Sequence, residues 1–287
     1  MKKTLLALAV LISGLSYGQD LPMPSPTSTV QQRIGLTDFT VVYSRPSVKE
    51  REIFGELVAY NELWRTGANA NTTLEFTTDI LFAGKKVEAG KYSLLTIPGE
   101  EEWVIILNKK TDMWGTGGYD KAMDAVQVKI NSNSTDMTET FTINFTDLRN
   151  ESAALSLRWA ETEVKIPITL EVQAKALENI ELAIAEAKPD TKWRVYRNAA
   201  NYYYNNKMDM ETALKYMKMS IESNEKNWYS YWLMAEIQAD MGQYNEAIKS
   251  AKTAVKIGED SAEESGSPFE YAGMINGSIE KWKAKKS

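Results

Sequence analysis

The sequence predicts an all-β antiparallel sandwich followed by an all-α domain of helical repeats. Residues 29–171 contain short runs in which apolar and polar side chains alternate, the period of two that is typical of half-buried strands. Residues 172–287 are rich in Ala, Glu, Lys, Met and Leu at helical spacing, and similar side chains recur 34 residues apart. No helical pattern interrupts the strands of the first part, which favours an antiparallel sheet over a parallel one.

The first 18 residues have the pattern of a secretory signal peptide. Lys2 and Lys3 precede an uncharged, mostly apolar run over residues 4–15, and small residues follow at Ser16 and Gly18. This run is shorter than the roughly 20 residues that a membrane-spanning helix needs. The chain also lacks the cysteine that a lipid anchor requires. We therefore expect a soluble protein that is exported to the periplasm or the extracellular space.

Residues 19–28 are expected to form an extended leader, because three prolines stand within residues 21–26. The β domain over residues 29–171 should then hold roughly eight to ten short strands. Strands are expected at residues 37–43, 74–78, 91–97, 103–107, 125–130, 140–146, 155–159 and 164–170, with turns at 83–85, 89–91 and 98–100. Pro167 cannot donate to a strand ladder, so the last strand is predicted to lie at an edge.

Six helices are expected in the second domain, residues 172–287. Five are placed at residues 174–188, 191–205, 209–223, 228–241 and 244–257. The sixth should begin near Ser267 and Pro268. Ser267 can cap this helix, Pro268 suits its first position, and Glu270 would complete a capping box.

The 34-residue spacing relates three pairs of positions in these helices: Ala213 and Ala247, Leu214 and Ile248, and Ser220 and Ala254. With this period the helical half resembles the tetratricopeptide repeat, a helix-turn-helix unit of the same length. The second copy matches the repeat consensus better, since the first has Met208 where the turn glycine stands. The outer helices, 174–188 and 268–284, are expected to cap the two repeats.

The repeat resemblance implies a concave surface on which a partner docks. The residues expected to face it are Asn198, Tyr202, Tyr229, Trp232 and Glu236. Exposed aromatic and amide groups on such a surface suit an extended peptide or a protein partner. The alternative is that Tyr202 or Trp232 packs under the neighbouring helix.

Several motifs stand out in the β half. They are Tyr43-Ser-Arg-Pro46, Arg51-Glu-Ile-Phe-Gly55, Leu63-Trp-Arg-Thr-Gly-Ala-Asn69, Gly90-Lys-Tyr92, Ile106-Leu-Asn-Lys109 and Trp114-Gly115. Through them residues 25–170 resemble a family of exported bacterial proteins, domain of unknown function 2911. The resemblance implies a β-rich exported domain, often followed by helical repeats, and supplies no catalytic residue.

A candidate ligand site lies within these motifs, mostly in turns between strands. Its residues are Arg45, Arg51, Trp64, Arg65, Asn69, Lys109, Trp114 and Tyr119. Arginine presents a planar donor fork to carboxylate, sulfate or phosphate, and aromatic rings offer a stacking surface. The set suits an anionic or carbohydrate-like ligand. In the alternative interpretation the arginines tie down loop carbonyls and carboxylates while the tryptophans fill the end of the sandwich.

The composition excludes several kinds of chemistry. The chain has no cysteine and no histidine, so disulfides, the usual Cys–His and Ser–His catalysis and the common zinc sites are excluded. The formal net charge is -6, which argues against general nucleic-acid binding. We expect neither a metal ion nor a cofactor.

The favoured interpretation is a non-enzymatic exported protein. Its β domain would bind a polar or anionic ligand or a partner, and its helical repeats would dock another protein. One alternative is a carboxylate-based hydrolase of glycan or envelope material. Glu50, Glu52, Glu56 and Glu62 could serve it, although ion pairs with Arg45, Arg51 or Arg65 are the expected role of these carboxylates. A second alternative is a purely structural protein of envelope assembly.

Overall fold

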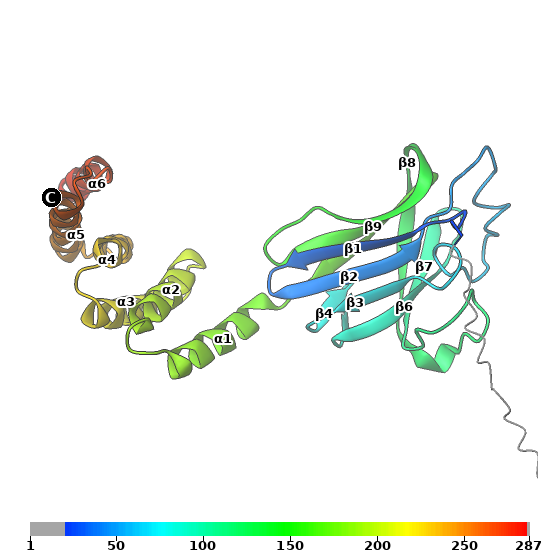
Figure 1. The fold of residues 1–287 in the computed structure, drawn as a ribbon, viewed down its shortest axis with the longest axis horizontal. Coiled ribbons are helices and arrows are strands. Elements are labelled where there is room, and N and C mark those ends of the chain that lie inside the picture. The colour runs from blue at the N-terminus through cyan, green and yellow to red at the C-terminus, as the bar shows by residue number, and fades with distance from the viewer. Residues whose placement is uncertain (1–20, 286–287) are drawn as a thin grey trace, which may run out of the picture. The chain divides into compact units, whose positions relative to one another are not determined.

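Nine β-strands and then six α-helices follow one another along residues 21–285, the part of the chain that this computed structural model describes (Figure 1). The predicted class, an antiparallel β domain followed by an α domain, is confirmed. The expected signal peptide, residues 1–18, lies outside the described residues. The chain divides after Val172 into two compact units. Within residues 21–285, no helix has both the length and the apolar character that crossing a bilayer requires.

All neighbouring strands pair antiparallel in the order β1-β2-β3-β6-β7-β8-β9-β4-β5. The strands are β1 (Thr27–Ile34), β2 (Thr37–Ser44), β3 (Thr73–Phe76), β4 (Ile80–Phe82), β5 (Lys85–Val87), β6 (Gly90–Ile97), β7 (Glu102–Asn108), β8 (Asp124–Thr146) and β9 (Ser152–Thr169). The β4–β5 hairpin and β1 are additional to the predicted strands. They escaped prediction because β4 and β5 have three residues each and β1 is mostly polar.

The sheet folds over on itself through the long strand β8. Its first part pairs with β7 as far as Asn131, and its second part pairs with β9 from Ser132 onward. The second part faces β2, because the Tyr43 hydroxyl donates to the Ile143 carbonyl (3.3 Å) and accepts from the Ile143 N–H (3.0 Å). The two halves of the sheet therefore enclose one apolar core, as a sandwich does.

Two long strands replace the four short ones that were predicted after residue 124. The β8–β9 ladder shifts register between Ser134 and Thr138 and again before Thr142, and Ala160 takes a positive φ of 49°. Such bulges break the alternation of side chains without ending the strand, which explains the error. The predicted edge position of Pro167 is also wrong. Strand β9 lies between β8 and β4, and Pro167 accepts a hydrogen bond from Ala83 where β4 ends.

The six helices are α1 (Val172–Glu186), α2 (Lys192–Asn205), α3 (Met210–Ser223), α4 (Trp228–Asp240), α5 (Tyr244–Ser265) and α6 (Ala272–Lys285). Side chains cap two of them: Asp209 accepts from two N–H groups of α3, and Asn227 accepts from one of α4. The capping box predicted at Ser267 is wrong. Helix α5 runs on to Ser265 and ends at Gly266 in the left-handed conformation, so α6 starts later than expected.

The 34-residue period is visible in the packing of the helices. Helices α3 and α5 start 34 residues apart, and the equivalent side chains of Ala213 and Ala247 are both fully buried. Helix α6 contributes Ile275 and Ile279 to the apolar cluster of α4 and α5, as expected of a cap. Helix α1 contributes no side chain to either apolar cluster of the helical unit, so the cap expected at residues 174–188 does not pack in this way.

Candidate functional site

The connection from β2 to β3, residues 45–72, forms the candidate site at one end of the sandwich. Backbone hydrogen bonds hold it to the sheet at several places. The Val48 N–H donates to the Glu139 carbonyl of β8 (2.8 Å), and Trp64 exchanges N–H and carbonyl with Thr96 of β6 (2.7 and 3.0 Å). These bonds position the side chains of the segment against both halves of the sheet.

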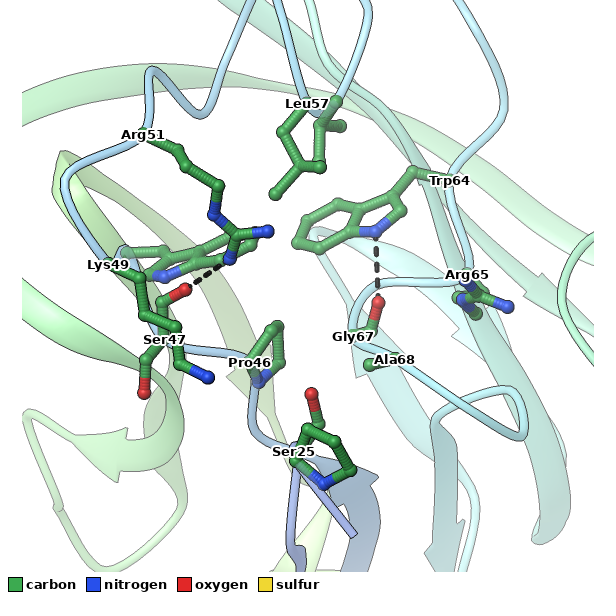
Figure 2. A pocket seen from close by; sticks show the side chains of 13 residues that line it. Ser25, Pro46, Ser47, Lys49, Arg51, Leu57, Trp64, Arg65, Gly67 and Ala68 are labelled. Atoms are coloured by element: carbon green, nitrogen blue, oxygen red, sulfur yellow. Dashed lines mark hydrogen bonds between the residues drawn. The ribbon is translucent and has the colours of Figure 1, made fainter.

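A pocket of about 310 Å³ opens between this connection, the leader and β9 (Figure 2). Its lining residues are Pro24, Ser25, Pro46, Ser47, Lys49, Arg51, Leu57, Val58, Trp64, Arg65, Gly67, Ala68 and Trp159. Figure 2 shows Lys49 and Arg51 on one side of the space and Trp64, Gly67 and Ala68 on the other. Arg51, Trp64 and Arg65 are the predicted site residues that the fold brings together here.

The three cations of this pocket have no carboxylate partner among residues 21–285. Arg51 instead donates to two carbonyls, from Nε to Val48 (2.9 Å) and from Nη2 to Ser47 (2.6 Å). Arg65 donates to the Asn69 carbonyl (3.2 Å). None of the three takes part in an ion pair of the described chain, and no lining residue is acidic. The ion pairs that we expected with the neighbouring glutamates are therefore wrong, and the pocket stays positively charged.

Two tryptophans close the inner end of the pocket. The rings of Trp64 and Trp159 stack with centroids 5.9 Å apart, and Trp159 is only 2% exposed. Nε1 of Trp64 donates to the Gly67 carbonyl (3.1 Å). Nε1 of Trp159 is buried and finds no acceptor among the described residues. A buried donor without an acceptor costs about 1–3 kcal/mol.

Two predicted site residues hold the neighbouring backbone in place. Arg45 donates from Nε to the Phe141 carbonyl (3.0 Å) and from Nη2 to Thr142 Oγ1 (2.8 Å), which ties the end of β2 to β8. Asn69 donates from Nδ2 to the Ser25 carbonyl (3.0 Å) and thereby fixes the leader beside the pocket. The contacts of Arg45 and Asn69 therefore agree with the alternative interpretation, in which these side chains fix the loop backbone and do not bind a ligand.

Lys109, Trp114 and Tyr119 lie outside the pocket, in the segment 109–123 between β7 and β8. The pocket therefore brings together only three of the eight residues expected to form one site, Arg51, Trp64 and Arg65. Trp114 is 69% exposed, whereas the Tyr119 hydroxyl donates to Asp124 Oδ2 (2.7 Å). Sequence order alone does not show that this segment folds over a different face of the sheet, where Tyr119 packs on a separate apolar cluster.

The pKa of Tyr119 is raised to about 12 by burial and then by the hydrogen bond to Asp124. The unfolded phenol ionises near pH 10. Its contribution to stability is therefore fully present below about pH 10 and is lost as the pH rises toward about 12. We expect the thermal midpoint of Tyr119→Phe to fall less steeply than that of the wild type above about pH 9. Parallel alkaline profiles would contradict this role.

The pocket residues that the sequence interpretation missed are Pro24, Ser25, Pro46, Ser47, Lys49, Leu57, Val58, Gly67, Ala68 and Trp159. Lys49 could have been found, because it stands two residues before Arg51 in the same turn-rich segment. Trp159 could not, since it occupies an ordinary inward position of a strand far along the chain. Only the folded sheet brings it against Trp64.

The predicted groove residues of the helical unit differ in exposure. Asn198 and Tyr229 are exposed, and Tyr202 and Glu236 are half-buried. Burial, and then the nearby Asp240, raise the pKa of Glu236. The expectation that Trp232 faces a partner is wrong. It is 6% exposed and stacks on Trp282 of α6 at 5.8 Å, as in the alternative that was considered.

No group of three or more acidic side chains gathers anywhere in residues 21–285 in a way that would hold a metal ion. A family model described as "Protein of unknown function (DUF2911)" matches residues 25–168, which is half of the chain. The comparison with curated proteins found no match. The matched residues coincide with the β domain and include the whole pocket except Pro24.

Proposed function

The chain belongs to the family described as "Protein of unknown function (DUF2911)", and we propose that its β domain binds a small anionic ligand, or an anionic group of a partner, without catalysis. The observation that carries this proposal is the charge of the pocket between the leader and β9. Three cations line it, no carboxylate does, and no ion pair of the described chain neutralises them.

The contacts of Arg51 support an anion rather than a neutral ligand. Its two hydrogen bonds to carbonyls hold the guanidinium plane in place and leave other N–H donors of the group for a ligand. The exposed ammonium of Lys49 adds a second positive charge on the same side of the pocket. Charge-assisted hydrogen bonds of this kind are about twice as strong as neutral ones.

The remaining walls indicate what else the ligand carries. Pro24, Pro46 and Leu57 present apolar surface to the pocket, and the ring of Trp159 adds to its wall. The volume of about 310 Å³ is at the lower limit of small-molecule sites. A compact molecule with an anionic group and some apolar surface fits this description.

The hydrolase alternative has no support at this pocket. Glycoside hydrolysis by carboxylates needs two of them facing one cleft, about 5–10 Å apart. The lining residues include none. A purely structural role in envelope assembly would not account for three pocket cations that form no ion pair within the described chain, so we prefer binding.

For the helical unit we propose tetratricopeptide-like repeats that dock another polypeptide after export of the protein. The 34-residue offset of α3 and α5 and the matching burial of Ala213 and Ala247 support the repeat. Exposed Asn198 on α2 and Tyr229 on α4 support a docking surface. The signal pattern of residues 1–18 is the basis for the proposed export.

Titration calorimetry with sulfate, phosphate and glucuronate tests the pocket. We expect at least one of these anions to bind, and Arg51→Gln to weaken its binding about tenfold or more, because a charge-assisted hydrogen bond is lost. Lys49→Gln should also weaken binding. Its side chain makes no hydrogen bond in the described structure, so its loss should not disturb the fold.

Arg149→Gln is the matched control for Arg51→Gln. Arg149 is an exposed arginine of the same domain that also donates to a neighbouring carbonyl (2.9 Å), but it lies outside the pocket. Binding to this variant should equal that of the wild type, and glucose should not bind. Equal losses in Arg51→Gln and Arg149→Gln, or no binding of any anion, would refute the proposal.

A further inference from the structure

A band of aromatic and arginine side chains crosses the helical unit from α2 to the start of α6. We call it the arginine–aromatic band, and it consists of Trp193, Arg194, Arg197, Trp228, Tyr229 and Tyr271. Each member contacts at least one other, so side chains of α2, α4 and the α5–α6 connection form one continuous surface. Only Tyr229 of this set belongs to the groove that the sequence predicted.

Arg197 lies at the centre of the band, between rings from two different helices. Its guanidinium carbon is 5.1 Å from the ring centre of Trp193 on α2 and 5.5 Å from that of Tyr229 on α4. Arg194 also lies over the Trp193 ring, at 5.0 Å. Rings on either side restrict a guanidinium group while its N–H donors, which lie in its plane, stay available.

The band continues as an exposed apolar surface. Trp228 packs edge-on against Tyr229 (5.6 Å) and stacks on Tyr271 (4.9 Å). Phe269 contacts Trp228 from the α5–α6 connection (4.9 Å) and holds this part of the band on the helices. Tyr271 is 51% exposed, and Met274 beside it is half exposed, so the apolar surface faces solvent.

The charge of the band is unbalanced within the protein. Among residues 21–285, neither Arg194 nor Arg197 forms an ion pair or donates a side-chain hydrogen bond. The first turn of α2 has no acidic residue, and its N-cap Thr191 makes no capping bond. Lys192 adds a third cation in the same turn, and the helix N-terminus adds partial positive charge.

We propose that the arginine–aromatic band binds an acidic segment of another polypeptide. A carboxylate of that segment pairs with the donor fork of Arg197, and an adjoining apolar side chain packs on Trp228 and Tyr271. This assignment rests on the proposed docking function of the helical unit and names its partner class. The predicted groove suits such a partner less, because Glu236 and Asp240 are close to each other there and repel a carboxylate.

Peptide binding to the full chain tests the proposal. The probes are fluorescent peptides in which several glutamates flank one phenylalanine, with matched sets carrying glutamine or lysine in place of glutamate. We expect fluorescence anisotropy to show binding of the glutamate peptide only, weakening as salt is added. Arg197→Gln should reduce the affinity about tenfold or more, and Arg197→Lys should recover part of it, since the charge returns without the planar fork.

Lys252→Gln is the matched control, because Lys252 is an exposed cation of the same unit outside the band. Circular dichroism spectra should show that every variant keeps its helices. Equal binding of the glutamate and glutamine peptides, or equal affinities of Arg197→Gln and Lys252→Gln, would overturn the proposal. Tighter binding of single-stranded RNA than of the glutamate peptide would also overturn it, in favour of a phosphate partner.

A second readout separates this proposal from the general docking function. If envelope proteins bind the wild type and Tyr202→Ala abolishes that binding while Arg197→Gln does not, the helical unit docks partners in the groove and the band assignment fails. If neither substitution changes the binding of any polypeptide, the docking function fails as well. If Arg197→Gln loses the binding of envelope proteins, and the glutamate peptide competes with those proteins for the wild type, the arginine–aromatic band is the docking site.

Discussion

Replacing Trp159 with alanine is expected to destabilise the β domain by about 3–5 kcal/mol. The ring is 2% exposed and packs against Trp64 (5.9 Å), Phe141 (5.8 Å) and Phe54 (6.2 Å). Alanine would leave a cavity among three aromatic rings that belong to a strand and to the β2–β3 connection. Because the sheet backbone around them is fixed by its ladders, the cavity can collapse only in part, and the loss should be near the upper end for a core substitution.

Urea unfolding of Trp159→Ala and Trp114→Ala, followed by circular dichroism, measures this effect. Trp114 is the matched control, since it is a tryptophan of the same domain that is 69% exposed. Its replacement should change the free energy of unfolding by no more than about 0.5 kcal/mol. Equal losses of unfolding free energy in the two variants would show that the Trp159 ring does not stabilise the core of the β domain.

The same variant separates the scaffold of the pocket from its binding groups. Trp159→Ala should lower both stability and anion binding, because the wall of the pocket is lost. Arg51→Gln should lower anion binding while the free energy of unfolding changes little, since Arg51 is exposed. Trp159→Phe keeps most of the ring volume and removes the unpaired N–H, so it should lose less stability than Trp159→Ala.

Gly258→Ala is expected to destabilise the helical unit by about 1–3 kcal/mol, although alanine normally stabilises a helix interior by about 1 kcal/mol over glycine. Gly258 lies buried in α5, where a methyl group would overlap the ring of Phe269. That ring packs edge-on against Trp228 at 4.9 Å and cannot move away freely. The strain therefore outweighs the gain in helix propensity.

Gly277→Ala is the control for this substitution. Gly277 lies inside α6, and no atom stands within 4 Å of the position that a new methyl group would take. This variant should gain about 0.5–1 kcal/mol in thermal or urea unfolding. If Gly258→Ala also gains stability, the Phe269 ring is not seated against α5 and cannot support Trp228 in the arginine–aromatic band.

The negative net charge of the chain does not reveal its two cationic surfaces, the pocket and the arginine–aromatic band. A net charge of -6 argues against general binding of polyanions. The pocket nevertheless gathers three cations and the band two, with Lys192 in the same turn of α2, and no described carboxylate forms an ion pair with any of them. Local geometry rather than composition thus determines what this protein can bind. The expected ligands are compact anions or single acidic segments, not extended nucleic acids.

Most of the fold could be predicted from local patterns. The alternation in β2 places Phe39, Val41 and Tyr43 in the core, as the period of two requires. The helices were found to within a few residues, except where α5 continues past its expected end. Some errors occurred where a bulge broke the alternation of apolar and polar side chains although the strand continued, as in β8 and β9. Others occurred where a strand was too short to show any alternation.

The candidate site could be predicted only in part. The sequence motifs of the β half predicted Arg51, Trp64 and Arg65 as ligand-site residues, and these three do line one pocket. The same motifs also marked Arg45 and Asn69, which hold backbone, and Tyr119, which belongs to another face. Residue type and loop position do not distinguish a side chain that points into a cavity from one that points at a carbonyl.

The sequence by itself determined the order of the two domains, the type of nearly every element and the absence of thiol and imidazole chemistry. These properties depend on composition and on side chains a few residues apart, which share one strand face or one helix face. Only the tertiary structure decided that Trp159 stacks on Trp64 and that Arg197 contacts both Trp193 and Tyr229. Such contacts join positions far apart in the chain, and their geometry follows from sheet folding and helix packing, which no local period records.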